Sequence, residues 1–399
     1  MIYPANFEEK IGFDRIREQV TALCSTPSAK AKLAEEGFST SADEIERRLS
    51  LMNEMRSLLM LERDFPDGDY PDPAPLVAKI RVEGSYLLAA EADQLRKALV
   101  TVGAIAEFIL GRGGAHYPRL WELSRRVTLF PEIVRAIDAI LDDRGEVKDS
   151  ASPELQQVRR AIREREGQAA KRLQQVLQRA KQAGIVDADA VLSVRDGRPV
   201  IPVAAANKRK LQGFIHDESA TGRTFYVEPV EVVEINNELK ELEYAERREV
   251  VKVLSAFTES IRLDAEAIAD AGDYLSSVDM IRAKARWALA NDAGKPILST
   301  DDRLELRTAR HPLLQQTLRA QGREVVPLDL ALDRRKHILV ISGPNAGGKS
   351  VCLKTTGLMQ YLFQCGYPVP ASEVSELPVF RSIFIDIGDE QSIDDDLST

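Results

Sequence analysis

The sequence contains no long apolar run, although 44% of its 399 residues are apolar. A helix that crosses a bilayer needs about 20 consecutive apolar residues. The first nine residues already include Asn6, Glu8 and Glu9, a composition that is not typical of a signal peptide. We therefore expect no secretion signal, no membrane span and a cytoplasmic location.

Cysteine and histidine are scarce. The three cysteines, Cys24, Cys352 and Cys365, lie far apart and show no C-x-x-C spacing. This argues against a disulfide framework and against a structural zinc site. The four histidines match no ligand spacing either, so a metal site built from histidine or cysteine is not expected.

Positive charge is also in short supply overall, because the formal net charge is -9. The chain as a whole is therefore not a polycation. The distribution is uneven, however: residues 159–210 carry thirteen basic and five acidic side chains. This local excess fits either an anionic partner or a well-solvated helix, and charge alone does not separate the two.

Residues 1–150 are predicted to form a helical core. Apolar residues recur at helical spacing, as in Ile45, Leu49 and Met52, and a proline and aspartate cluster at 65–75 separates two helical groups. The second group is expected to form helices at 91–110 and 131–141. Nothing in this region suggests chemistry, so its expected role is scaffolding.

The middle of the chain predicts an antiparallel helical arm with a β-rich tip. Apolar residues keep a spacing of three and four over 151–184 and again over 230–262, whereas 185–229 contains β-prone runs and turns. A helical return to the core is expected over 263–297. Residues 298–399 then follow an α/β pattern.

The tip of the arm concentrates basic residues: Arg195, Arg198, Lys208, Arg209, Lys210 and Arg223. A basic tip on an extended arm suits contact with a phosphate backbone, which provides affinity without reading base sequence. Phe214, Phe225 and Tyr226 could stack on bases, but we interpret them as the small core of the tip.

The most informative motif fits G-x-x-x-x-G-K-[ST], and its residues are Gly343, Pro344, Asn345, Ala346, Gly347, Gly348, Lys349 and Ser350. We expect a strand at 338–341 before it and a helix at about 350–363 after it. Glycines let backbone N–H groups surround phosphate oxygens, Lys349 would neutralise the outer phosphates, and Ser350 would hold Mg2+. The motif predicts nucleotide binding, with a bare glycine turn as the alternative.

Two residues near this motif have competing interpretations. His311, in an Arg-His-Pro sequence, could flank the nucleotide, but a turn histidine before proline is the preferred interpretation. Cys352 is interpreted as a packed helix residue, with a reactive thiol near the helix start as the alternative.

Short β-prone pieces at 304–306, 325–326 and 383–385 complete the predicted α/β pattern.

Together with the phosphate loop and the basic tip, the phrases at 142–155, 225–239 and 388–393 resemble the MutS family, specifically its second bacterial branch. The resemblance implies a multidomain fold of α plus α/β type. It would comprise a helical core, antiparallel lever arms, a small β-rich clamp and the N-terminal part of an ABC-type P-loop ATPase domain. Nothing precedes the helical core, so mismatch recognition is not expected.

The resemblance also implies function. Members of this branch are homodimeric ATPases that use ATP and Mg2+ and embrace DNA, and the segment 388–399 looks like a signature loop that reaches the partner's nucleotide, with Ser398 as the contact. The implied role is a clamp on branched DNA that suppresses recombination. The alternatives are a rescue factor on stalled ribosomes, contacting rRNA, and a structural chromosome-organising ATPase, which would need longer heptads.

The resemblance further implies that part of the catalytic machinery is missing. The run 383–386 could be a Walker B strand with Glu390 as base, but in this family that strand leads into the signature loop. The acids that hold Mg2+ and the Smr-type endonuclease domain would then follow later. We expect this chain to bind nucleotide weakly and not to hydrolyse ATP.

Overall fold

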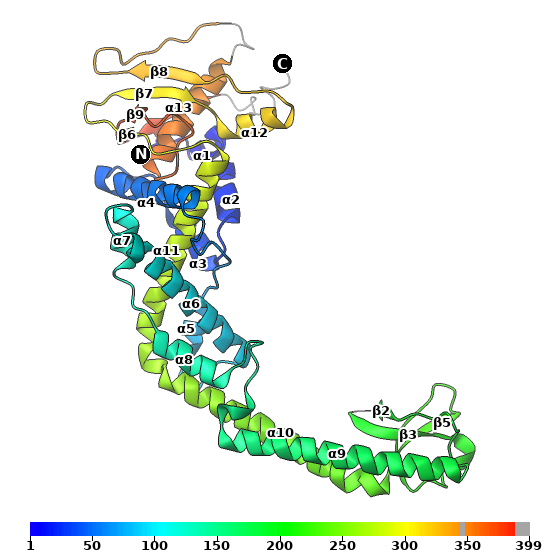
Figure 1. Cartoon of the computed structure of the whole chain (residues 1–399). Helices are drawn as coiled ribbons and strands as arrows, with labels where there is room; N and C mark the ends of the chain where they lie inside the picture. Colours follow the sequence, from blue (N-terminus) through cyan, green and yellow to red (C-terminus); the bar gives the residue numbers. More distant parts are fainter. Residues whose placement is uncertain (196, 344–347, 388–399) are drawn as a thin grey trace. The chain divides into compact units, whose positions relative to one another are not determined.

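The computed structural model describes residues 1–195, 197–343 and 348–387. The chain forms two compact units that interleave along the sequence (Figure 1). The first unit contains Met1–Ala78, Gln94–Pro131 and the chain from Asp264 onward, and the second contains Lys79–Asp93 and Glu132–Leu263. Within the described ranges, no helix combines the length and apolarity that a bilayer crossing requires.

Two helices of the first unit, those that start at Pro27 and Ala42, begin at a side-chain cap. Thr26 and Ser41 accept hydrogen bonds from the backbone N–H groups of Ala29 and Glu44, which satisfies donors that a helix start leaves unpaired. The helices that lie wholly or largely in this unit are α1 (Phe7–Ile11), α2 (Phe13–Ala22), α3 (Pro27–Glu35), α4 (Ala42–Leu61), α5 (Ala74–Ile80), α6 (Ala89–Arg112), α7 (Pro118–Ser124), α11 (Ala265–Ala290), α12 (Pro312–Ala320) and α13 (Lys349–Gln364).

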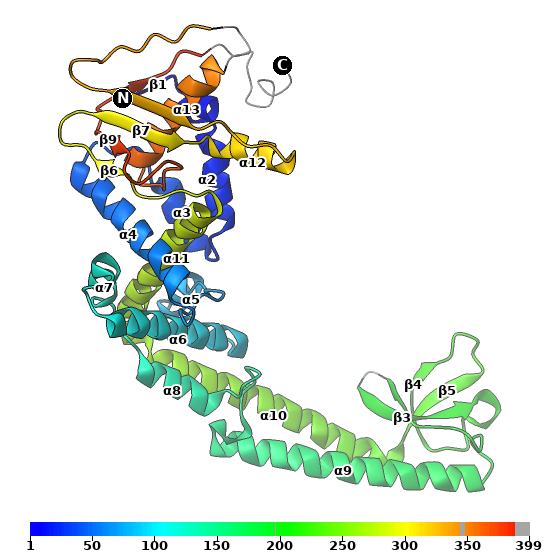
Figure 2. The ribbon, with the colours of Figure 1, turned by 45° about the horizontal axis from the view of Figure 1, so that its top comes forward.

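A four-stranded sheet of order β6-β9-β7-β8 packs beside α13 (Figure 2). Its strands are β6 (Ile297–Leu298), β7 (Leu304–Ala309), β8 (Leu328–Leu332) and β9 (Glu376–Leu377). Leu304 and Leu306 of β7 share one buried core with Leu358 and Leu362 of α13. The sheet and α13 are therefore fixed to each other by apolar packing.

A second, two-stranded sheet joins the two ends of the described chain. The strand β1 (Ile2–Tyr3) pairs in parallel with β10 (Ile383–Phe384). The β-prone piece predicted at 383–385 thus forms a strand, and its partner is the first strand of the chain.

The strand expected at 338–341 does not form. Ile338, Leu339 and Val340 are 77%, 51% and 84% exposed, and no strand in the described ranges pairs with them. An apolar run becomes a strand only where a neighbouring backbone completes its ladder. The β-prone piece predicted at 325–326 was also wrong, because the strand in this region, β8, begins two residues later, at Leu328.

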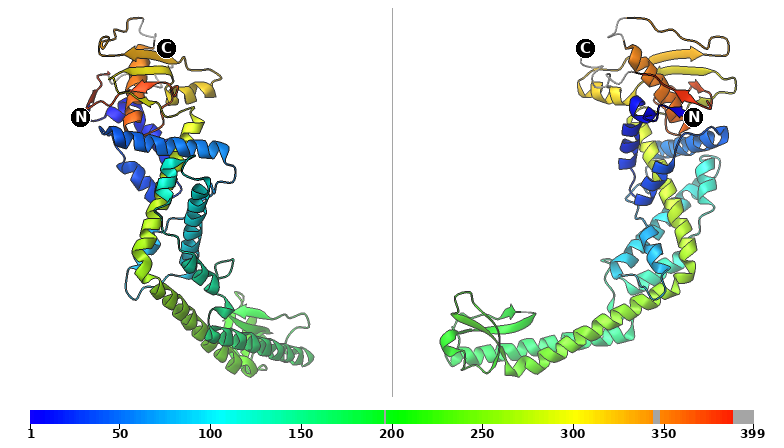
Figure 3. Two further views of the ribbon diagram at one scale, coloured as in Figure 1. Left: turned by 60° about the vertical axis from the view of Figure 1, so that its left-hand side comes forward. Right: turned by 180° about the vertical axis from the view of Figure 1, so that it is seen from behind.

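The second unit is dominated by two long helices, α9 (Pro153–Gln182) and α10 (Val230–Ser260), which lie side by side and antiparallel in both views of Figure 3. The shorter helix α8 (Pro131–Ile140) precedes them. Helix α9 starts at Pro153 because proline suits the first helical position and Ser152 Oγ accepts a 3.0 Å hydrogen bond from Leu155 N.

A four-stranded sheet of order β2-β3-β5-β4 lies between α9 and α10 in the sequence. Its strands are β2 (Ser193–Arg195), β3 (Arg198–Ala204), β4 (Gly213–Glu218) and β5 (Thr224–Pro229). Ile201, Val203 and Val227 pack with Leu173 and Val176 of α9 into one small core. The sheet is thus anchored on the end of α9 and is not an independent domain.

The interpretation of the tip aromatics as core residues was only partly right. Phe225 packs partly buried against the small core, and Tyr226 is half-buried. Phe214 is 59% exposed, because it lies on β4, an edge strand of the sheet.

Candidate nucleotide and nucleic-acid sites

The described part of the phosphate loop comprises Gly343, Gly348, Lys349 and Ser350. Gly348 adopts a left-handed conformation, with φ 76°, and caps the N-terminus of α13. Glycine reaches this conformation without the cost that a side chain would add. Lys349 Nζ donates a 2.7 Å hydrogen bond to the carbonyl oxygen of Gly343, so the lysine joins the two ends of the loop.

Helix α13 is held firmly behind this loop. The ring of Tyr361 contacts those of Phe7 and Phe13 at centroid distances of 5.1 and 4.9 Å, and its hydroxyl donates a 2.6 Å hydrogen bond to Glu8. The N-terminus of the helix, where Lys349 and Ser350 lie, is therefore presented by a packed element. A helix N-terminus is favourable for phosphate groups because its N–H groups and dipole point toward them.

Several predicted site residues fall outside the described residues. These are Pro344, Asn345, Ala346 and Gly347 of the phosphate loop, Ser398 of the expected signature loop and Glu390. Asp386, the acid of the run at 383–386, is described and is exposed to solvent.

The two residues with competing interpretations near the loop are both buried to some degree. His311 is 2% exposed and caps α12, and burial lowers its pKa to about 4, so its imidazole is neutral near pH 7. Burial raises the pKa of the Cys352 thiol, which is the opposite of what a reactive thiol needs. Cys24, Cys352 and Cys365 are all free thiols.

The six basic residues predicted at the tip fall into two groups. Arg195 and Arg198 are engaged within the tip: Arg195 Nε lies 2.9 Å from Asp217 and its guanidinium sits 3.9 Å from the ring centroid of Tyr226. Such stacking adds cation–π attraction to the ion pair. These two arginines help to hold the sheet together.

The other four, which we call the basic quartet, are Lys208, Arg209, Lys210 and Arg223. All four are exposed, and none forms an ion pair with a described residue. The N–H of Ala205 donates a 2.9 Å hydrogen bond to the carbonyl of Arg223, which brings Arg223 beside the turn that carries the three others. The quartet therefore lies together at one end of the sheet.

A buried carboxylate organises the tip, and the sequence-based predictions missed it. Glu228 is 1% exposed and accepts from Arg198 Nη1 at 2.9 Å, His216 Nε2 at 2.5 Å and Asn236 Nδ2 at 2.6 Å. Burial tends to raise the pKa of Glu228, but the hydrogen bonds from Asn236, His216 and Arg198 outweigh it and hold the pKa below its ordinary value. The network ties β3, β4 and β5 to α10.

Ion pairs also cross between the two long helices. Arg159 Nε lies 2.7 Å from Glu246, Arg165 Nε lies 2.9 Å from Glu238, and Arg179 lies 3.4 Å from Glu231. Each pair joins α9 to α10. Three of the eight basic side chains of α9 are therefore paired with a glutamate of the neighbouring helix.

Comparison with known proteins places this architecture in a family. Residues 339–399 match the MutS domain V model. The proteins named endonuclease MutS2 from Bacillus velezensis and from Thermomicrobium roseum are 34% and 36% identical over 389 and 400 residues, covering 97% of this chain. The chain spans about half the length of these relatives, 48% and 49% respectively. A putative endonuclease MutS2 from Bacillus subtilis is 34% identical over the same 97% of the chain. The chain therefore belongs to the MutS family, as a relative of the MutS2 proteins.

Proposed function

We propose that this protein is a nucleotide-switched clamp on nucleic acid and that its preferred substrate is branched DNA. ATP with Mg2+ would bind at the phosphate loop, with Lys349 on the outer phosphates and Ser350 on the metal. Helices α9 and α10 would act as lever arms, and the sheet that they carry as the clamp. Two copies would embrace the DNA, as a homodimer that suppresses recombination.

The basic quartet is the observation that carries this proposal. Four exposed cations without acidic partners among the described residues lie together in the segments at one end of the small sheet. Exposed Lys and Arg side chains bind phosphate oxygens and release counterions, which favours contact with a nucleic-acid backbone of any sequence. Arg195 and Arg198 would support the clamp from within, because their guanidinium groups are already paired.

Salt-dependent binding to a four-way DNA junction tests the proposal. Replacing Lys208, Arg209 and Lys210 by alanine should weaken junction binding and lower the slope of log K against log salt by about 3, since each phosphate contact contributes roughly 0.9. The matched control replaces three exposed cations of α9, Arg160, Lys171 and Arg172, which changes net charge equally. That control should leave the slope nearly unchanged.

The same titration separates substrates. Linear duplex and intact ribosomes are measured beside the junction at each salt concentration. Tighter binding to the junction than to the duplex supports the branched-DNA preference. Ribosome binding without measurable DNA affinity, or equal losses in the tip and control variants, would reject the proposal.

A further inference from the structure

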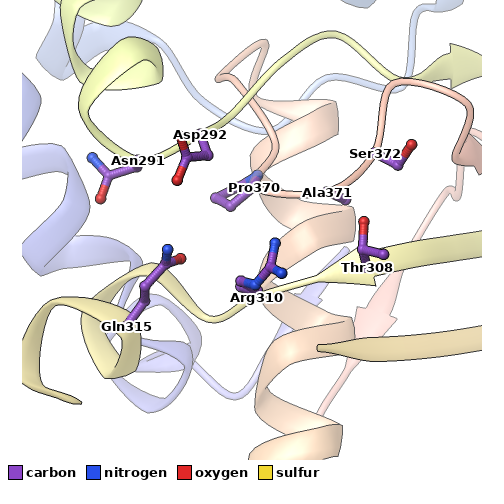
Figure 4. A pocket seen from close by; sticks show the side chains of 8 residues that line it. All are labelled: Asn291, Asp292, Thr308, Arg310, Gln315, Pro370, Ala371 and Ser372. Atoms are coloured by element: carbon purple, nitrogen blue, oxygen red, sulfur yellow. The ribbon is translucent and has the colours of Figure 1, made fainter. Parts of the chain in front are cut away.

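A small polar pocket lies in the first unit, away from the phosphate loop (Figure 4). Its volume is about 200 Å³, and it is bordered by the end of α11, the end of β7, the start of α12 and the segment 370–372. The polar residues that line it are Asn291, Asp292, Thr308, Arg310, Gln315 and Ser372. Helix α13, of 16 residues, separates the segment 370–372 from the phosphate loop in sequence, and its length is about 24 Å.

Arg310 gives the pocket a positively charged side chain that has no ion-pair partner among the described residues. Its backbone N–H donates a 2.9 Å hydrogen bond to Pro370 O, so the residue is fixed at the pocket wall. Its side chain is half-buried and points into the pocket (Figure 4), and its guanidinium forms no ion pair or hydrogen bond with a described residue. Partial burial of an unpaired charge is unfavourable.

The one acidic residue of the pocket does not compensate Arg310. The carboxylate of Asp292 pairs with Arg319 Nη2 at 2.7 Å. The amide of Asn291 is occupied as well, since Oδ1 accepts from Gln316 and Nδ2 donates to Trp287 O. The pocket therefore keeps a net positive charge.

Two hydroxyl groups add further unused donors. Neither Thr308 Oγ1 nor Ser372 Oγ has a hydrogen-bond partner among the described residues, and both side chains line the same space as Arg310 (Figure 4). One guanidinium and two hydroxyls form a set that can donate to several oxygens of one ligand.

The backbone of this pocket is strained. Thr308 and Asp292 have φ of 50° and 51°, and the only other described non-glycine residue with positive φ is Asp302. A β-branched residue rarely adopts this conformation, and such strain concentrates at ligand sites. The strained turn is held by Thr308 N, which donates a 2.7 Å hydrogen bond to Asp329 Oδ1. It follows that strain and unused donors occur at the same residue.

We propose that this pocket binds a small tetrahedral oxyanion, either inorganic phosphate or a phosphate monoester. Arg310 neutralises the anion, and the hydroxyls of Thr308 and Ser372 donate to its remaining oxygens. A phosphate suits a guanidinium and two hydroxyls that line one pocket better than a planar carboxylate does, because its oxygens point in more directions. The pocket volume leaves room for a small organic group on the phosphate.

Calorimetric titration of the whole chain in phosphate-free buffer tests this site, with inorganic phosphate and glycerol phosphate as probes. Both titrations are repeated in a Lys349→Ala background, so that any binding at the phosphate loop is removed. Arg310→Gln should weaken binding about tenfold or more, the loss typical of a hydrogen-bonded charge. The matched control is Arg323→Gln, an exposed arginine beyond α12, which should leave the affinity unchanged.

Thermal unfolding distinguishes a binding role from a structural one. Because the Arg310 guanidinium has no partner in the described chain, Arg310→Gln should not lower Tm without phosphate, whereas phosphate should raise Tm only in proteins that retain Arg310. Thr308→Gly should relieve strain and raise Tm while weakening phosphate binding. The tighter of the two probes identifies the ligand class. Phosphate affinity that is unchanged by Arg310→Gln in the Lys349→Ala background, or binding that disappears entirely with Lys349→Ala, would overturn the proposal.

Discussion

Replacing Arg198 by methionine removes the guanidinium that pairs with the buried carboxylate of Glu228 while keeping an apolar stem. Glu228 then stays 1% exposed with only His216 and Asn236 as partners. Breaking a buried ion pair by removing one partner costs about 3–5 kcal/mol, because the remaining charge is left uncompensated. Arg198 is 22% exposed, so we expect a cost near the lower end, about 3 kcal/mol.

Arg195→Met is the matched control, because it removes a second arginine from the same hairpin. Arg195 and Asp217 are 34% and 48% exposed, and a surface ion pair contributes no more than about 1 kcal/mol. Loss of the stacking on Tyr226 adds about 0.5–1 kcal/mol. The two variants should therefore differ clearly, although each deletes one guanidinium.

The pH dependence provides a second, independent criterion. The pKa of Glu228 lies below its ordinary value of 4.5, so its stabilising contribution is present above about pH 4.5 and is lost as pH falls through the folded-state pKa. Without Arg198, fewer hydrogen bonds stabilise the charged carboxylate of Glu228 against the effect of burial. The pKa of Glu228 must therefore rise. The folded variant then takes up a proton more readily than the folded wild type. Its loss of stability relative to the wild type should therefore be smaller at pH 5 than at pH 7.

Native-state hydrogen exchange of the β5 amides measures this deficit, since local opening of the sheet is reported directly and global two-state unfolding is not required. The expected result is a loss of protection in Arg198→Met that is large at pH 7 and smaller at pH 5. Equal losses in the Arg198 and Arg195 variants, or a deficit that does not change with pH, would refute the buried-carboxylate account.

Two further substitutions test the first unit. Gly366→Ala should lower Tm, because Gly366 has φ 71° and an added Cβ would lie 2.5 Å from Cβ of Arg48; an unchanged Tm would contradict this close approach. Arg282→Met should reduce the free energy of unfolding of this unit by about 3–5 kcal/mol, because Asp279 would remain fully buried without its cation. Arg286→Met, which removes a more exposed pair, should cost no more than about 1 kcal/mol in the same denaturant titration.

Helices were the part of the fold that the sequence predicted well. The ranges expected at 91–110, 131–141 and 350–363 correspond to α6, α8 and α13, with ends that differ by only one or two residues. Helix signals are local, since apolar spacing and capping residues act within a few positions of each other. The same local information located the glycine that caps α13.

Strand pairing was predicted less well, because it depends on residues that are distant in sequence. The run at 338–341 has the composition of a buried strand, yet Ile338, Leu339 and Val340 are exposed and no described strand borders the run. Conversely, β10 forms by pairing with residues 2 and 3, a partner that lies more than 370 positions away. Amino-acid composition indicates that a segment can form a strand, but it does not indicate whether a neighbouring strand is present to pair with it.

The sequence pattern also did not predict the hydrogen-bond network around Glu228. A glutamate beside a proline at the end of a strand is expected to face solvent, because carboxylates are rarely fully buried. Here the fold brings Arg198, His216 and Asn236 from three other elements onto that carboxylate. The only available signal was the phrase at 225–239, which includes Glu228 and Asn236 and supported the family resemblance.

The basic excess over residues 159–210 shows why a charge count along the sequence left two interpretations open. The count follows α9 and includes none of the acids of α10, which begins at residue 230. In the folded pair, Arg159, Arg165 and Arg179 each lie against a glutamate of α10, so part of the helical excess is balanced. Exposed cations of α9 such as Arg160 and Lys171, and the basic quartet at the end of the sheet, have no ion-pair partner among the described residues. The solvated-helix interpretation therefore suits the paired part of the arm, and the anionic-partner interpretation suits the tip, where the unpaired cations lie close together.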